Sequence, residues 1–132
     1  MPAGDAFSGR QLDSIERAIR QAEEFGGLDY SVYVGDTDGD PRERGRQLLG
    51  ALGQEVARNH VAVVVDPGHR SLAILTGSRA SLHLDDRATA LAAMSMTSSF
   101  GAGDLAGGIV DGLRTLAEHA RQPRALHTDV EN

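Results

Sequence analysis

The chain has 132 residues, 40% of them hydrophobic and 24% charged, which is the composition of one globular domain large enough to bury its own core. Lys and Arg number 13 and Asp and Glu 19, so the formal net charge of −6 argues against a protein that binds nucleic acid through its phosphates. Cysteine is absent, which excludes disulfides, thiolate metal sites and thiol nucleophiles.

The two ends of the chain show no pattern typical of a targeting or membrane segment. Residues 1–6 are expected to be a flexible lead-in, residues 7–122 a single α/β domain, and residues 123–132 a flexible tail. The amino terminus lacks a signal-peptide pattern, and no window approaches the roughly 20 apolar residues of a membrane span. We therefore expect a cytoplasmic protein without direct membrane insertion, with peripheral association at a membrane as the alternative.

Ser8 opens the first predicted helix. Its hydroxyl can accept from the backbone N–H of Gln11 while the Gln11 side chain reaches back, which makes a capping box. Phe7 and Leu12 form the hydrophobic staple that accompanies such a start. Gly26-Gly27 ends the helix, since glycine suits the left-handed residue with which many helices end.

A strand and a second helix follow. Tyr30–Gly35 alternates as a half-buried strand does. After the acidic loop 36–41, Asp40 is placed to cap the helix, with Pro41 as its first residue. The expected apolar stripe comprises Leu48, Leu49, Leu52 and Val56. Close approach of the helix to a sheet would account for its glycines, which are Gly45, Gly50 and Gly53.

Val61–Val65 and Leu72–Leu75 are two apolar runs that do not alternate with polar residues, so both strands should be covered on both faces. Pro67-Gly68 between them predicts a type II-like turn with positive φ at Gly68. The strand–helix–strand order implies a right-handed parallel crossover into Val61–Val65, after which the return strand is antiparallel. The predicted fold is a three-layer α/β/α sandwich with a mixed sheet and about four helices.

Two further helices complete the prediction. Asp85 or Asp86 caps the third helix, and the residues available to its core side are Ala88, Leu91, Ala92 and Met96. The Ser- and Gly-rich stretch Thr97–Gly103 is expected to be a loop. Asp104 caps the fourth helix, which ends before Pro123. Its apolar stripe is Leu105, Ile109, Leu113, Leu116 and Ala120.

Asp36, Asp38 and Asp40 are candidate metal ligands, because closely spaced carboxylates suit Ca²⁺ or Mg²⁺. An EF-hand counted from Asp36 fails, since it would need Gly and Glu where Pro41 and Gln47 stand. A looser cation site, and with it a calcium-responsive binding domain, is one alternative. The other is a turn followed by a helix cap.

Asp85 and Asp86 form a second acidic group, with His83 close by in the sequence. These three are the candidates for metal binding or catalysis at this position. The remaining histidines have no ligand spacing and are interpreted as surface or loop residues: His60, His69, His119 and His127. Gly101–Ala106 satisfies G-x-G-x-x-A only formally, because no strand precedes it, so no nucleotide cofactor is expected.

The order of features resembles a known family. An early helix, a strand, a helix and an apolar strand lead to a D-x-x-x-R turn, a strand ending in Thr-Gly, acidic residues and a Phe-x-x-Gly-Asp segment before the last helix. This resembles the TPM domain family, named for a thylakoid-lumen protein, a photosystem II repair protein and a nicotinic-receptor modulator. It looks closest to small actinobacterial relatives of unknown function, over about 7–121. The motif residues are Asn59, Asp66, Arg70, Thr76, Gly77, Phe100, Gly103 and Asp104.

The resemblance implies an α/β/α sandwich and a role in membrane-protein or cell-envelope maintenance. It also implies, from some plant members, an acid phosphatase with divalent ions at an acidic rim. The family's Asp-Asn-Gly stands here as Arg58-Asn59-His60, so a carboxylate is missing. We therefore expect a non-catalytic accessory domain with a protein partner. A weak divalent-metal-dependent phosphatase using Asp85, Asp86 and His83 is the alternative, and the sequence implies no oligomeric state.

Overall fold

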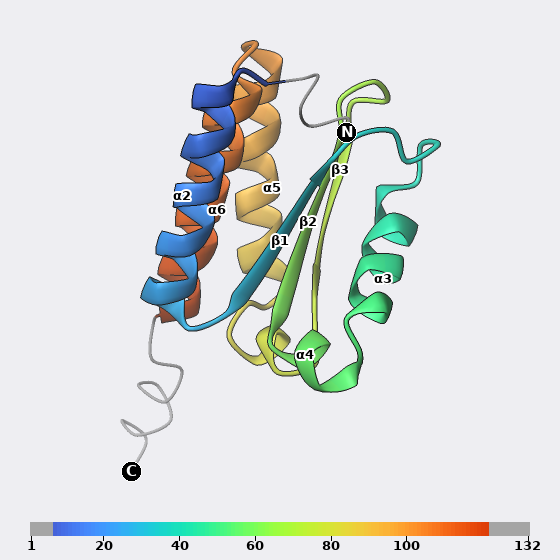
Figure 1. Cartoon of the computed structure of the whole chain (residues 1–132), viewed down its shortest axis with the longest axis vertical. Helices are drawn as coiled ribbons and strands as arrows, with labels where there is room; N and C mark the ends of the chain where they lie inside the picture. The colour runs from blue at the N-terminus through green and yellow to red at the C-terminus, as the bar shows by residue number, and fades with distance from the viewer. Residues whose placement is uncertain (1–6, 122–132) are drawn as a thin grey trace.

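The computed structural model describes residues 7–121, which form three layers (Figure 1). A three-stranded sheet lies in the middle. One face is covered by α2 (Gly9–Gly26), α5 (Asp86–Gly101) and α6 (Leu105–Arg121), and the other by α3 (Pro41–Ala51). The short helices are α4 (Gln54–Arg58) and the 3₁₀ turn η1 (Ala80–Leu82). The α/β/α sandwich expected from the sequence is confirmed.

The sheet has the order β1 (Asp29–Val34), β2 (His60–Asp66), β3 (Ser71–Thr76). β1 and β2 are parallel, and β2 and β3 are antiparallel, as expected for a crossover followed by a hairpin. Every residue of β2 is buried. The unbroken apolar run therefore forms the central strand, with helices on both of its faces.

Successive side chains of β2 point to opposite faces of the sheet, so alternate residues belong to two separate hydrophobic cores. Val61, Val63 and Val65 face the layer of α2, α5 and α6, which holds the larger core. Ala62 faces α3 and packs with Leu75 in a smaller core. Because β2 contributes to two cores, its middle residues, Val61–Val65, are all apolar.

Helix α2 confirms the predicted start and stop signals. Ser8 Oγ accepts from the Gln11 N–H at 3.2 Å, and Gln11 Oε1 accepts from the Ser8 N–H at 2.9 Å, so the capping box is complete. Phe7 is buried and Leu12 packs against the same core. Gly27 ends the helix with φ 79. Local side-chain chemistry decides both ends of this helix.

The second predicted helix is broken into α3 and α4 in the structure. Gly53 adopts φ 83 between them, which a continuing helix does not allow. Val56 is consequently half exposed instead of joining an apolar stripe. Gly45 fits the expected close approach to the sheet, because a Cβ there would lie 3.2 Å from Leu75 Cγ. Gly50 has no such neighbour.

The β2–β3 turn differs from the prediction in its backbone. Gly68 is not at positive φ, whereas Arg70 is, with φ 51. The Arg70 N–H donates to the Pro67 carbonyl at 3.2 Å, and Asp66 Oδ1 accepts from the His69 N–H at 3.2 Å. The Asp66 side chain therefore helps to close the turn. Arg70 takes a conformation that costs a non-glycine residue about 1 kcal/mol.

The stretch Thr97–Gly103, expected to be a loop, is mostly helix in the structure. α5 continues through it because Phe100 packs against the main core. Gly108 of α6 makes room for that ring, since a Cβ there would lie 2.7 Å from Phe100 Cε1. Gly112 likewise faces Met96. Packing between α5 and α6 outweighs the low helix propensity of the Ser and Gly residues.

The caps of the last two helices are confirmed. Asp85 Oδ1 accepts from the Ala88 N–H at 2.9 Å, and Asp104 Oδ1 accepts from the Gly107 N–H at 2.9 Å. Leu91 is 43% exposed, although it was expected to be available to the core. The outer face of α5 is therefore more apolar than the prediction implied.

The predicted lead-in 1–6 lies outside the described residues, and so does the tail 123–132. Within residues 7–121, none of the helices combines the length and the apolar character that crossing a membrane requires.

Candidate functional site

The carboxyl ends of β1 and β2 meet at one edge of the sheet, which we call the upper rim (Figure 1). The acidic loop 36–41, the turn 66–70 and the α5–α6 junction 101–104 reach this rim. The lower rim holds the start of β2, the end of β3 and the start of α5. Ligands of open α/β sheets bind preferentially at the carboxyl ends of the strands.

Asp66 is the buried carboxylate of the upper rim, with 1% of its surface exposed. Its Oδ2 accepts from the Thr37 N–H at 2.9 Å, the Thr37 hydroxyl at 2.6 Å and His69 Nδ1 at 2.9 Å. Burial alone would raise the pKa of Asp66, but the hydrogen bonds from Thr37 and His69 outweigh it and hold the pKa well below its usual range. Asp66 therefore stays ionised and fastens loop 36–41 to the turn.

Asp36, Asp66 and His69 are the one group among residues 7–121 whose ligand atoms could surround a metal ion, all lying within 4.8 Å of one another. Asp36 is 74% exposed, and its Oδ1 lies 3.7 Å from His69 Nδ1. Because a carboxylate only accepts, His69 carries its proton on Nδ1 and donates it to Asp66. An ion would have to displace that proton, which lowers the affinity of the group for metal.

The carboxylates of Asp38 and Asp40, the other two acids of loop 36–41, are not part of this ligand group. Asp40 Oδ1 accepts from the Glu43 N–H at 3.1 Å and caps α3. Asp38 lies at φ 54, and its N–H donates to Asp36 Oδ1 at 2.9 Å. The structure thus groups Asp36 with Asp66 across the rim rather than with Asp38 and Asp40.

A groove of about 500 Å³ opens at the upper rim beside the turn. Its walls come from the ends of β2 and α5 and the starts of β3 and α6. Four motif residues noted in the sequence lie in it: Asp66, Arg70, Phe100 and Gly103. The other lining residues are Val65, Pro67, Ser71, Leu72, Thr97, Gly101 and Leu105. Asp104, the fifth motif residue of this region, caps α6 next to the groove.

One charged group of this upper-rim groove is unused, and a hydroxyl near it is buried without a partner. Arg70 takes part in none of the ion pairs found among residues 7–121. Ser71 Oγ is buried without a hydrogen-bond partner in the same part of the chain. Thr97, by contrast, donates its hydroxyl to the Ala93 carbonyl at 2.8 Å. Ser71 shares the face of β3 with Ala73 and Leu75, so its buried hydroxyl points to the α3 side of the sheet. The groove therefore combines apolar walls with the Asp66 carboxylate and one unpaired cation.

The lower rim holds the remaining motif residues, and Asn59 connects three segments there. Its Nδ2 donates to the Gly27 carbonyl at 3.0 Å and to Asp29 Oδ2 at 3.3 Å, and Arg79 donates to its Oδ1 at 3.0 Å. Asn59 thus connects the end of α2 and the start of β1 to the segment after β3. Thr76 is the last residue of β3. These bonds are structural.

Gly77 and His60 also lie at the lower rim. The Gly77 N–H donates to the His60 carbonyl at 2.9 Å. His60 is buried and its Nε2 lies 2.6 Å from Ser31 Oγ. Burial lowers the pKa of His60, although the charges of Asp29 and Glu23 oppose the shift. His60 is therefore a neutral core residue rather than the surface residue that the sequence indicated.

Asp85, Asp86 and His83 lie at the start of α5, also on the lower rim. Asp85 is occupied as the cap of that helix. The three side chains do not form a group of metal ligands in the part of the chain that the structure describes. A phosphoryl-transfer site needs a cation or a cluster of donors to stabilise developing charge, and this geometry gives the phosphatase alternative little support.

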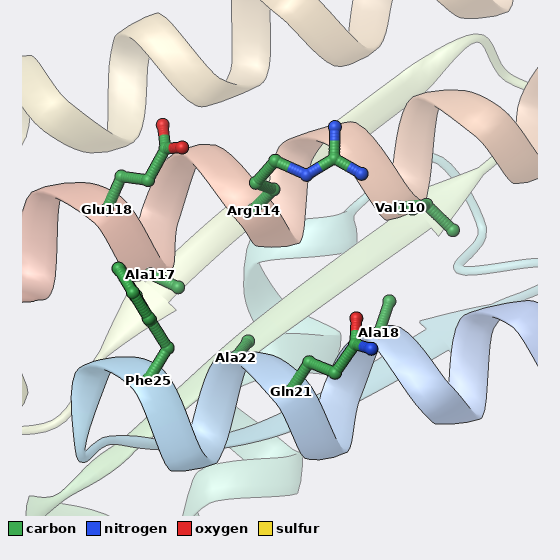
Figure 2. Close-up of a pocket in the computed structure, with 8 residues that line it drawn as sticks. All are labelled: Ala18, Gln21, Ala22, Phe25, Val110, Arg114, Ala117 and Glu118. Atoms are coloured by element: carbon green, nitrogen blue, oxygen red, sulfur yellow. The ribbon is translucent and has the colours of Figure 1, made fainter.

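A second hollow, of about 230 Å³, lies between α2 and α6 (Figure 2). Small residues on both helices let them pack closely there. Figure 2 shows Phe25 extending from α2 toward Ala117 of α6, while the charged ends of Arg114 and Glu118 point away from α2. Arg121 covers the Phe25 ring, with Cζ 4.5 Å from its centroid. Gln21 is the polar side chain that Figure 2 shows between the two helices, and Arg114 pairs with Asp111 instead, so the hollow lacks the converging polar groups of a typical binding site.

The model of a domain of unknown function, DUF5130, matches residues 2–117 of the sequence. The chain belongs to the DUF5130 family. No curated protein matches this DUF5130 chain. The TPM assignment is therefore wrong, and the membrane and cell-envelope roles that it implied have no remaining basis. The order of helices and strands that suggested it is a property of the fold, and a fold does not identify a family.

Three solved NMR structures are similar to this DUF5130 domain. The BA42 protein of the psychrophilic bacterium Bizionia argentinensis has a TM-score of 0.76 at 19% identity, over 86% of this chain and 81% of that chain. The N-terminal domain of cg2496 from Corynebacterium glutamicum has 0.73 at 18%, over 92% and 80%. The N-terminal domain of a P. gingivalis protein has 0.72 at 17%, over 86% and 75%. Identities this low show a shared fold alone.

Sequence reasoning missed several residues of the upper rim. His69 is the exposed turn residue that the sequence indicated, but its two donations to Asp66 were not foreseen. The signal available was Asp66 at the first position of a turn, where an Asp side chain accepts from the backbone ahead of it. Thr37, Ser71 and Thr97 carry no comparable signal, because only the fold brings them to the rim.

Proposed function

We propose that this domain is a non-catalytic binding protein whose ligand has an anionic group and an apolar body, held in the upper-rim groove. The observation that carries the proposal is the unpaired Arg70 in the wall of an otherwise largely apolar groove. An anion beside Arg70 would gain charge-assisted hydrogen bonds. The walls formed by Leu72, Phe100 and Leu105 would hold the apolar body and exclude water.

The backbone of Arg70 supports the proposal independently. An arginine at φ 51 is unfavourable by about 1 kcal/mol, and a glycine or asparagine would avoid most of that cost. Residues that keep a costly conformation cluster at binding and active sites. The strain at Arg70 is thus accounted for if its guanidinium has a ligand.

The groove offers no nucleophile beside a free base among the described residues. Asp66 and His69 are bonded to each other, and the Thr97 hydroxyl is bonded to the backbone. Nucleophilic catalysis needs a base within hydrogen-bond reach of the hydroxyl that it activates. Binding without chemistry is therefore the function that this geometry supports best.

Hexanoate, a carboxylate with a short apolar chain, is the probe that tests the proposal. In an NMR titration the amides of Ser71, Gly101 and Gly103 are expected to shift, with 1-hexanol giving at least about tenfold weaker binding because it lacks the charge. Arg70→Asn should remove binding without loss of stability, since Asn tolerates positive φ. Arg87→Asn, at the other end of α5, is the control and should bind as the wild type. Groove amides that stay unmoved at about 50 mM hexanoate would contradict the proposal.

A divalent cation at Asp36, Asp66 and His69 is a second candidate, because these ligand atoms lie within 4.8 Å of one another. Binding has to displace the His69–Asp66 bond, so we expect a dissociation constant on the order of 1 mM and a gain of about 0.4 kcal/mol at 1 mM ion. Thermal melts with CaCl₂ or MnCl₂ measure it. Asp36→Asn should abolish the gain, whereas Asp13→Asn, an exposed acid on α2, should keep it. An equal gain in both variants would rule this site out.

A further inference from the structure

β3 is an edge strand of the sheet, and the hydrogen bond of Gly77 shows which of its backbone groups do not pair with β2. The Gly77 N–H donates to the His60 carbonyl, and the register pairs Ala62 with Leu75 two residues further on. In an antiparallel pair, hydrogen-bonded and non-hydrogen-bonded positions alternate. The residues of β3 whose N–H and C=O groups point away from β2 are therefore Leu72, Ile74 and Thr76. None of these groups has a partner among the hydrogen bonds of residues 7–121.

The opposite edge of the sheet is better protected. On β1, the outward N–H of Tyr30 donates to the Glu23 carboxylate of α2 at 3.1 Å. β3 has no such side chain bonded to its outward groups in the described chain. Open edges with unpaired backbone groups readily accept another strand. The outward N–H groups of Val32 and Val34 on β1 also lack a partner among residues 7–121, so the β3 edge is distinguished because it begins at the groove.

The apolar surface beside β3 continues from the groove along α5. Helix α5 lies over β3, and α2 over β1, with α6 packed between them. Thr97 and Gly101 line the groove, and Met94 lies one turn earlier on the same side of the helix. Met94 is 69% exposed. A strand added to β3 would place alternate side chains toward this side of α5, because side chains at opposing positions of paired strands share a face.

The charge at the end of this edge determines which strand fits. Arg70 stands immediately before β3 with no ion-pair partner in residues 7–121, and the buried hydroxyl of Ser71 follows it. A chain that ends in a free carboxylate supplies an anion at one end of an extended backbone. If its carboxylate meets Arg70, the chain must run antiparallel to β3, from the Thr76 end toward the groove.

We propose that the groove and the β3 edge together bind the free carboxyl terminus of an extended peptide, which adds antiparallel to β3, with its carboxylate at Arg70 and its last apolar side chain in the groove. This proposal rests on the proposed function of the groove and identifies the ligand as a peptide with a free carboxyl terminus. Binding of C-terminal peptides to a sheet edge combines backbone hydrogen bonds for affinity with a pocket for specificity. The outward groups of Leu72, Ile74 and Thr76 offer three N–H donors and three C=O acceptors for those backbone bonds.

A library of hexapeptides randomised at all positions, with free carboxyl termini, is the probe. Fluorescence polarisation should select members with an apolar last residue that bind at least about tenfold more tightly than hexanoate. The C-terminal amide of each selected peptide should bind at least about tenfold more weakly. N-methylation along the peptide should weaken binding at every second residue only, because alternate N–H groups face β3. Arg70→Asn should remove the preference for the free acid, and Arg87→Asn should not.

Thr76→Pro tests the edge from the protein side. Proline removes an outward N–H, which β2 does not use, so the fold is expected to survive and peptide affinity to fall several-fold while hexanoate binding stays. If Thr76→Pro does not fold, the N-methyl scan of the peptide still tests whether the peptide backbone pairs with β3.

Five outcomes overturn the inference. Amidated peptides that bind as well as the acids refute the Arg70 contact, and an N-methyl scan without period two refutes the added strand. If hexanoate binds and no peptide binds more tightly, the proposed function stands and the peptide inference fails. If neither hexanoate nor any peptide shifts the groove amides, both fail. A dimer in light scattering that Thr76→Pro converts to a monomer would assign the edge to a second copy of this chain instead.

Discussion

Replacing Asp66 with Asn is expected to lower the free energy of unfolding by about 3 kcal/mol at neutral pH. The Asn side chain has the same size, but its NH₂ group would face the donors of Thr37 or His69. Urea unfolding at pH 7 measures the loss. Asp111→Asn is the control, because this half-exposed carboxylate pairs with Arg114 at the surface and should contribute less than about 0.5 kcal/mol.

The stabilisation from Asp66 is also expected to depend on pH in a definite direction. Its folded-state pKa lies below the unfolded-state value of about 3.9, so the contribution is complete above that value and is lost as the pH falls through the folded-state pKa. The difference in unfolding free energy between wild type and Asp66→Asn should therefore be constant from pH 7 to about pH 5 and shrink below pH 4. A difference that stays constant down to pH 3 would show that the charge of Asp66 is not what stabilises the rim.

Replacing Gly77 with Ala is expected to cost at least about 3 kcal/mol. A Cβ at this position would lie 2.7 Å from the Arg58 carbonyl oxygen and still closer to that of Ala57. Both atoms belong to the backbone of α4, so no side-chain rotation can relieve the overlap. The strand β3 would have to move away from α4, which breaks the bond between the Gly77 N–H and the His60 carbonyl.

Gly50→Ala is the matched control for this substitution. Gly50 lies inside α3 with no atom within 4 Å of a Cβ, so Ala should raise the unfolding free energy by about 0.5 to 1 kcal/mol. Circular dichroism during urea unfolding compares the two variants, and loss of a cooperative transition in Gly77→Ala agrees with the prediction. A Gly77→Ala protein as stable as the wild type would mean that α4 is not held where the structure places it.

Most of the fold could be predicted from local signals. The capping residues Ser8, Asp85 and Asp104 act within three positions along the chain, so their types and spacing suffice. The central strand was recognisable because burial on both faces leaves an unbroken apolar run. Each of these signals is contained in a short segment.

The predictions that were wrong depended on contacts between segments that are distant in the sequence. Gly50 and Gly53 look alike in the sequence, and only Gly53 takes positive φ and breaks the helix. Phe100 keeps its segment helical because Gly108 lies opposite in space, which residues 97–103 alone do not reveal. The candidate site depends on contacts of this second kind. Arg70 and Phe100 are thirty positions apart in the sequence, and they share a groove only because α5 packs over β3.

The first and the last helices of the described chain lie side by side, and this has a consequence for synthesis. α6 packs between α2 and α5, over the face of the sheet to which Val61, Val63 and Val65 contribute. A ribosome adds about 5 to 20 residues per second, so roughly 3 to 11 s pass between completion of β2 and completion of α6. During that interval one face of the most apolar strand has no cover, and the nascent chain is most exposed to aggregation before its final helix has been made.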